Sequence, residues 1–139
     1  MHRKYSIIAI ISITFFVLTA CDLGSNLTYE DIQGEWDFPS VTFNNAATGP
    51  VHLSVLDPVG TQIGIDLWWN DYDNFYYGDG TMDGNTFTGT YDVGGDSETD
   101  AYTIVVKFSM VGDKLKASFS GQGPLNGLVL ESGEPTPSS

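Results

Sequence analysis

The sequence contains a single cysteine, Cys21, so no disulfide can form within one chain. After that cysteine it contains no arginine, and its only lysines are Lys107, Lys114 and Lys116. These three lysines stand against 18 acidic residues, which gives residues 21–139 a formal net charge of −15. Nucleic-acid binding requires basic residues that neutralise phosphates. The composition therefore argues against a nucleic-acid partner and against attraction to anionic lipid headgroups.

Long apolar runs are also scarce, because the chain has one such run, at residues 5–20, and no second one. The run follows the basic segment Met1–Lys4 and ends in small residues, which is typical of an export signal. It is shorter than the roughly 20 residues that a membrane-spanning helix needs. We therefore predict a signal peptide at residues 1–20. Its removal leaves 119 of the 139 residues, enough for one domain.

The segment Leu18-Thr19-Ala20-Cys21 ends this run and resembles the lipobox of bacterial lipoproteins. The resemblance implies cleavage before Cys21 and attachment of acyl chains such as palmitate to it. Two or three acyl chains make membrane residence stable, and an exported chain with one unpaired thiol otherwise lacks an explanation. We expect a tether at residues 21–28 and a lipid-anchored location on the cell membrane or outer membrane, facing the periplasm or the exterior. The alternative is an ordinary signal followed by a chance cysteine.

Helical periodicity is absent after the tether, where apolar and polar residues alternate instead. A period of two places the apolar side chains on one face of a strand. Turn residues recur about every 8 to 12 positions, as in all-β domains. The apolar series predicted to point inward comprises Ile32, Trp36 and Phe38; Val51, Leu53 and Val55; Ile63, Ile65, Leu67 and Trp69; Phe87, Tyr91 and Val93; Tyr102, Ile104, Val106, Phe108 and Met110; and Leu115, Ala117 and Phe119.

This pattern predicts an all-β domain over residues 29–130, built as one antiparallel up-and-down barrel of about eight strands. A two-sheet β-sandwich is the alternative. A membrane-spanning barrel with its apolar face outward would also alternate, but several strands look too short for it. The polar, proline-bearing residues 131–139 are predicted to be a disordered tail.

Two hairpins can be examined for register. Gly112-Asp113 suits a two-residue type II′ turn, which pairs Met110 with Leu115 and Phe108 with Ala117.

The turn at Asp83-Gly84-Asn85 leaves two registers open. A two-residue turn sends Tyr76 inward, whereas a three-residue turn sends Phe75 and Tyr77 inward. A bulge at Gly78 and Gly80 would change the result. We predict that Phe75 and Tyr77 point inward.

Ile32-Gln33-Gly34-Glu35-Trp36 resembles the Gly-x-Trp opening of lipocalin-like barrels, the calycins. The resemblance implies that Trp36 plugs one end of the barrel and that the open end holds a small apolar ligand. The arginine that packs on this tryptophan in lipocalins has no counterpart here, since residues 21–139 contain none.

Two functions follow from these patterns. The first is a membrane-anchored, non-enzymatic module that binds a small apolar or aromatic ligand inside the barrel. Its candidate ligand-binding residues are Trp36, Trp69, Tyr77, Tyr91 and Tyr102. The alternative is a structural or interaction lipoprotein that contacts an envelope protein or glycan through exposed aromatic residues and acidic loops. Its candidate surface residues are Trp68, Tyr72 and Tyr76.

Catalytic and metal-binding patterns are sparse. His52 is the one histidine after the signal, and it stands on the polar side of its strand, so we predict no enzymatic activity. We predict no metal and no cofactor. Carboxylates at Asp71, Asp73, Asp79 and Asp83, and at Asp92, Asp96, Glu98 and Asp100, leave open a hard cation such as calcium. Solvated turns explain the same residues.

Overall fold

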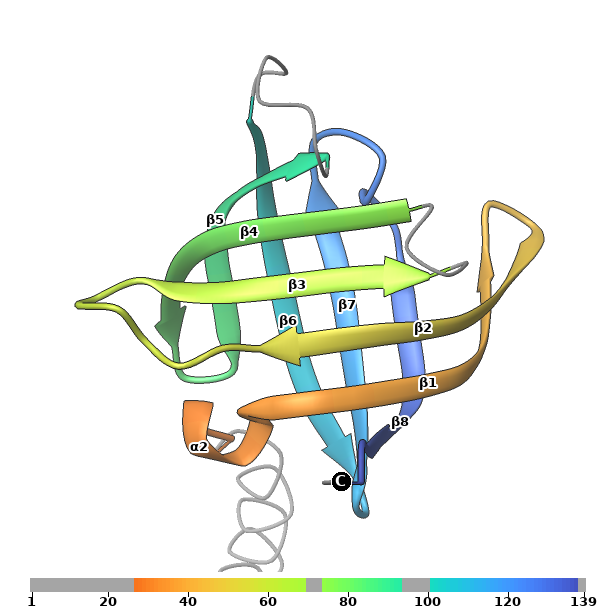
Figure 1. Ribbon diagram of the computed structural model, residues 1–139, viewed down its shortest axis with the longest axis horizontal. Helices are drawn as coiled ribbons and strands as arrows, with labels where there is room; N and C mark the ends of the chain where they lie inside the picture. The colour runs from red at the N-terminus through yellow and green to blue at the C-terminus, as the bar shows by residue number, and fades with distance from the viewer. Residues whose placement is uncertain (1–26, 70–73, 94–100, 138–139) are drawn as a thin grey trace, which may run out of the picture.

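The computed structural model describes residues 27–69, 74–93 and 101–137. Its strands are antiparallel, each pairs with the next, and the last pairs with the first to close a barrel (Figure 1). The elements are α2 (Tyr29–Ile32), β1 (Gly34–Phe43), β2 (Ala46–Val55), β3 (Ile63–Trp69), β4 (Asn74–Asp83), β5 (Thr86–Val93), β6 (Tyr102–Val111), β7 (Lys114–Gly121) and β8 (Val129–Pro135). The predicted eight-stranded up-and-down barrel is confirmed, and the two-sheet sandwich is wrong.

The apolar side chains of the strands line the interior of this barrel. Along β3 every second residue is buried, from Ile63 to Trp69. The largest fully buried side chains include Phe38, Phe87 and Phe108. The apolar face therefore points inward, the reverse of the arrangement in membrane-spanning barrels.

The four-residue helix α2 precedes β1 and is too short to produce a periodic signal in the sequence. The Asp31 carboxylate caps it by accepting hydrogen bonds from the Thr28 backbone N–H at 2.8 Å and the Thr28 hydroxyl at 3.1 Å. Ile32 is fully buried in the core, so the helix closes the barrel beside the start of β1. No helix in the described part of the chain is long and apolar enough to cross a membrane.

The β6–β7 hairpin has the predicted register. Met110 pairs with Leu115 and Phe108 with Ala117. Gly112 has φ of 65° at the first central position of the turn, a conformation that glycine adopts without a steric penalty.

The predicted register of the β4–β5 hairpin is wrong. Asp83 pairs with Thr86, so the turn has two central residues, and Tyr76 rather than Tyr77 points inward. Asn85 fixes this short turn, because its backbone and side chain both bond to the backbone of Phe108 on β6, each at 2.9 Å. The sequence of the β4–β5 hairpin could not predict this contact, because its partner lies on a third strand.

The predicted tail also begins too early, because β8 continues through Pro135. Glu134 pairs with Asp37 of β1, and Gly133 pairs with Leu115 of β7. Gly133 lies so close to the Phe38 ring that an added Cβ would stand 2.5 Å from it. The polar composition of residues 131–135 arises because these residues close the barrel with their side chains directed mostly to solvent.

Candidate functional site

Three of the five residues predicted to bind a ligand lie together inside the barrel, where Tyr76 joins them. The ring centroids of Trp69 and Tyr76 are 5.3 Å apart, those of Tyr76 and Tyr91 6.1 Å, and those of Tyr91 and Tyr102 5.4 Å. Trp69, Tyr76 and Tyr91 are buried, and Tyr102 is partly exposed. The rings therefore form one packed cluster.

The Tyr91 hydroxyl links this cluster to the chain between β7 and β8. It donates a hydrogen bond to the Gln122 carbonyl oxygen at 2.7 Å and accepts one from the Leu125 N–H at 3.0 Å. Burial raises the pKa of Tyr91 and of Tyr76 above the ordinary tyrosine value. Both phenols therefore stay neutral, and Tyr91 acts as a structural tie.

The space left inside the barrel is small. The cavity lined by Tyr76, Tyr91, Phe119 and their neighbours has a volume of about 20 Å³. That volume suffices for about one water molecule, whereas ligand pockets usually measure about 300–1,000 Å³. A small ligand at this cavity would therefore have to displace the side chains that line it.

The other two ligand-binding candidates lie elsewhere. Trp36 is buried beside α2, where its indole N–H donates to the Ile32 carbonyl oxygen at 2.8 Å. Tyr77 lies on the outer face of β4 with 41% of its surface exposed. Tyr76, predicted as a surface residue, is the one that points inward.

A continuous row of aromatic side chains crosses the outside of the barrel. The strand register places Asp37, His52, Trp68 and Phe75 opposite one another on β1 to β4. His52 stacks on Trp68 with centroids 5.4 Å apart and 22° between the ring planes. The Phe75 centroid lies 6.4 Å from that of Trp68 and 6.2 Å from that of Tyr77. We call His52, Trp68, Phe75 and Tyr77 the outer aromatic row.

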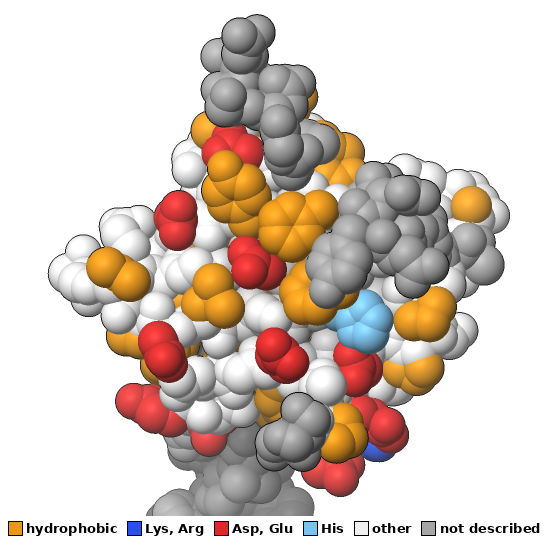
Figure 2. Space-filling model, in the orientation of Figure 1, with side chains coloured by type: hydrophobic (Ala, Val, Ile, Leu, Met, Phe, Trp, Pro, Cys, Tyr) orange, Lys and Arg blue, Asp and Glu red, His pale blue; other side chains and the backbone are white. Residues whose placement is uncertain are grey.

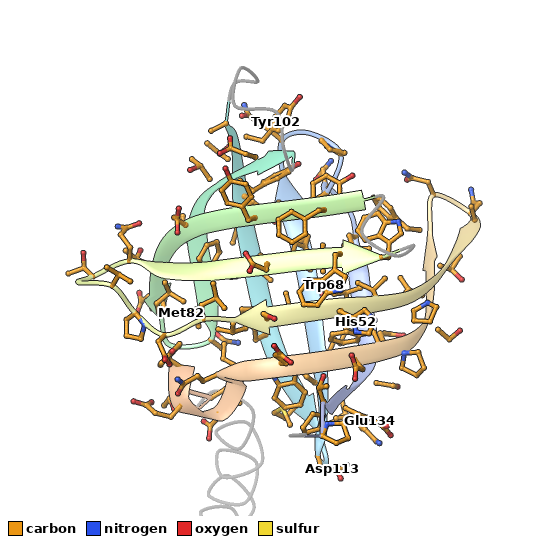
Figure 3. All side chains as sticks on the ribbon, in the orientation of Figure 1. His52, Trp68, Met82, Tyr102, Asp113 and Glu134 are labelled. Carbon is orange, nitrogen blue, oxygen red and sulfur yellow. The ribbon has the colours of Figure 1, made fainter. Side chains whose placement is uncertain are left out.

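The outer aromatic row lies on the face of β1–β4 seen in Figure 2, where hydrophobic and acidic side chains are intermingled. Figure 3 shows His52 and Trp68 side by side on adjacent strands of this face. The imidazole of His52 also contacts the Asp37 carboxylate. These two contacts fix the ring of His52, because Asp37 contacts its Nδ1 atom and Trp68 stacks on its face.

A groove lies at the β1 end of the outer aromatic row. It has a volume of about 290 Å³, and its lining includes Glu35, Asp37, His52, Trp68 and Thr136. The backbone N–H of Thr136 donates to the Glu35 carbonyl oxygen at 2.9 Å, which brings the end of the chain to the rim of the groove. The groove thus combines two carboxylates with an aromatic wall.

Charge is divided between the two sides of the barrel. In the described residues every lysine lies on β6 or β7. There, Lys114 pairs with Glu134, and the Lys116 Nζ lies 3.4 Å from a carboxylate oxygen of Glu131. The outward carboxylates of β1 to β5 have no lysine or arginine on their own strands. These carboxylates are Glu35, Asp37, Asp66, Asp79, Asp83 and Asp92.

The pKa of Asp66, one of these carboxylates, is affected by the neighbouring negative charge. Burial raises its pKa above the ordinary aspartate value, and the neighbouring Asp79 carboxylate raises it further. In the register, Asp66 stands opposite Tyr77, beside the outer aromatic row. Among the described residues no lysine or arginine forms an ion pair with Asp66, so its negative charge lies beside the outer aromatic row.

Several predicted residues lie outside the described residues, namely Cys21, Tyr72, Asp71, Asp73, Asp96, Glu98 and Asp100. Within the described ranges, no group of three or more His, Cys, Asp or Glu side chains is arranged to hold a metal ion.

Sequence reasoning found Trp68 but missed the contacts of Phe75, His52 and Asp37. Strand alternation already places His52 and Asp37 on outward faces. Their alignment with Trp68 depends on the register between strands, which no single-strand pattern contains. Phe75 was misplaced together with the β4–β5 turn.

Comparison of the chain with protein-family models, curated proteins and solved structures finds no match.

Proposed function

We propose that this chain is a non-enzymatic lipoprotein of the cell envelope that contacts another envelope molecule through the outer face of β1–β4. The observation that carries the proposal is the position of its aromatic residues. Trp68, Phe75 and Tyr77 form a connected outer row, whereas the cavity lined by Tyr76, Tyr91 and Phe119 measures about 20 Å³. Tyr77 is exposed, and Trp68 and Phe75 are partly exposed. Such rings are typical of contact sites, because rigid rings bury much area with little loss of entropy.

Binding of a small ligand inside the barrel stays a prediction without geometric support. A ligand would have to displace the packed rings of Tyr76 and Tyr91, and Tyr91 is tied by two hydrogen bonds. The outer face requires no such rearrangement, so it is the better candidate for recognition.

The membrane anchor is the second part of the proposal. It depends on the lipobox-like segment that ends at Cys21 and on the export signal before it. We expect Cys21→Ser to move the protein from the membrane fraction to the soluble fraction, because no acyl chain can be attached. The measurement is fractionation of cells with immunodetection, and a variant that stays in the membrane fraction contradicts the anchor.

The contact surface can be tested by site-specific photo-cross-linking in the native host. The photoreactive residue p-benzoyl-phenylalanine replaces Tyr77, which is 41% exposed on β4. A matched control carries the same residue at Val111, which is 70% exposed on the opposite β6–β7 hairpin. We expect a cross-linked product from position 77 and none from position 111.

Two results would contradict the proposed surface. Equal cross-linking from positions 77 and 111 would indicate non-specific contact, and cross-linking from 111 alone would place the partner on the other side of the barrel.

A further inference from the structure

The outer aromatic row and the groove beside it indicate the charge of the partner. This inference rests on the proposed function, since it concerns the same surface. We propose that the partner is a protein segment bearing arginine, and that one arginine side chain enters the groove between Glu35 and Trp68.

The first argument concerns how a partner can bind. Because β8 pairs with β1, the barrel is closed, and a peptide that added as a strand at this seam would have to displace β8. Side chains on the outer face must therefore supply the contacts. On β1–β4 these side chains are the outer aromatic row and the carboxylates beside it.

The second argument is charge complementarity. Glu35 and Asp66 project from strands that carry no lysine or arginine, and the negative charge of Asp79 acts on Asp66. Asp37, on the same face, contacts the imidazole of His52. The lysines Lys114 and Lys116 contact the carboxylates Glu134 and Glu131 of β8. A cationic partner would supply a counter-charge to Glu35 and Asp66, whose strands carry no lysine or arginine.

The third argument favours arginine over lysine. The groove of about 290 Å³ lies just below the range of pockets for drug-sized molecules, so it fits a single long side chain. Its lining offers the Glu35 carboxylate and the stacked rings of His52 and Trp68. A planar guanidinium can lie flat against an aromatic ring and pair with a carboxylate through two parallel N–H groups, whereas a lysine ammonium is a point charge without that planar fork.

The test is a titration of the full chain in detergent with three labelled peptides of identical Gly/Ser background. One peptide carries arginines, one carries lysines, and one carries citrullines, which keep the shape of arginine without its charge. Fluorescence anisotropy at low and high salt measures binding. We expect the arginine peptide to bind, the lysine peptide to bind several-fold more weakly, and the citrulline peptide to show no binding.

Variants locate the peptide on the surface. We expect Trp68→Ala and Glu35→Gln each to weaken binding of the arginine peptide about tenfold, the size of a desolvated cation–π or charged contact. Matched controls, Val111→Ala and Asp113→Asn on the β6–β7 hairpin, should leave it unchanged. Trp68→Ala also removes the stack with His52, so thermal unfolding is measured to check that this variant is folded. Glu35→Gln tests the groove without changing how its lining residues pack.

Each contrary outcome has a definite meaning. Equal binding of the arginine and citrulline peptides, or full binding by Glu35→Gln, overturns the inference. Preferential binding of a neutral oligosaccharide such as chitotetraose also overturns it and identifies a glycan partner. If position 77 still cross-links in the host under these outcomes, the proposed function stands and only the arginine partner is wrong. If position 77 does not cross-link, the proposed function falls regardless of the titration.

Discussion

Asp66 is a half-buried carboxylate on the outer face of β3 whose charge is opposed by its surroundings. Burial, and then the Asp79 carboxylate, raise its pKa in the folded protein above the usual value of 3.8. The folded state therefore holds the Asp66 proton more tightly than the unfolded chain does. Stability falls as pH rises from the unfolded pKa through the folded pKa, and ionised Asp66 destabilises the fold at neutral pH.

We predict that Asp66→Asn stabilises the protein at pH 7 by a few tenths of a kcal/mol, a small value because water still reaches part of the carboxylate and screens its charge. The gain should vanish below pH 3.8, where the carboxyl is protonated in both states. Urea unfolding at the two pH values measures it. Asp113→Asn, beside Lys114, serves as the control and should give no gain, and a stabilisation of Asp66→Asn that persists at low pH would contradict this explanation.

Tyr91 tests whether the interior rings are structural. Removing its hydroxyl in Tyr91→Phe leaves the Leu125 N–H, 3.0 Å away, without its acceptor. We expect a loss of about 1–2 kcal/mol in the free energy of unfolding. Tyr102→Phe is the matched control and should change stability by less than about 0.5 kcal/mol. Comparable losses in both variants would show that the hydrogen bonds of the Tyr91 hydroxyl do not stabilise the fold specifically.

Strands β4 and β5 pack against each other through glycines on their inner faces. Gly80 pairs with Gly89, and a Cβ at Gly80 would lie 2.3 Å from the Thr88 carbonyl oxygen. These glycines permit a close approach of two backbones, and the pairing runs without a register shift. The bulge that the sequence left open at Gly78 and Gly80 does not form.

We therefore expect Gly80→Ala to destabilise the barrel by about 2–3 kcal/mol, because the obstructing atoms belong to the backbone. Gly64→Ala on the outer face of β3 is the control. There the nearest atom, 3.0 Å away, is the end of the flexible Leu56 side chain, so the loss should be smaller. Thermal unfolding of both variants decides the matter, and equal midpoints would contradict the close approach.

The two hairpins illustrate what a sequence can predict at the scale of an element. Gly112-Asp113 encodes its own turn, so local chemistry sufficed for the β6–β7 register. The β4–β5 register depends on Asn85 bonding to Phe108 on a third strand. The observed register differs from the predicted one by one residue, so Tyr76 lies inside the barrel and Tyr77 on its surface. Tyr76 therefore joins the interior cluster, and Tyr77 joins the outer aromatic row.

At the scale of the whole molecule, alternation predicted the barrel because it requires only that the apolar faces of the strands meet. It did not predict closure by residues 131–135, whose polar composition is typical of a tail. Nor could it predict whether the interior was filled, since that depends on how the large rings interlock around Tyr91.

Closure by β8 gives a prediction of its own. Deleting residues 131–139 removes the pairing of Glu134 with Asp37 and the packing of Gly133 on Phe38. We expect loss of cooperative thermal unfolding, measured by circular dichroism. The control Glu134→Gln removes only the exposed contact with Lys114 and should change stability by less than about 1 kcal/mol. A deletion variant that unfolds cooperatively at the original temperature would show that these residues are dispensable.

The central claim is that recognition occurs outside the barrel and not within it. Native mass spectrometry of the protein extracted from its own envelope tests this claim most directly, with Trp68→Ala and Tyr91→Phe as paired variants. We predict an associated partner of protein mass that Trp68→Ala loses and Tyr91→Phe retains. A small-molecule adduct that survives Trp68→Ala and disappears in Tyr91→Phe would contradict the account.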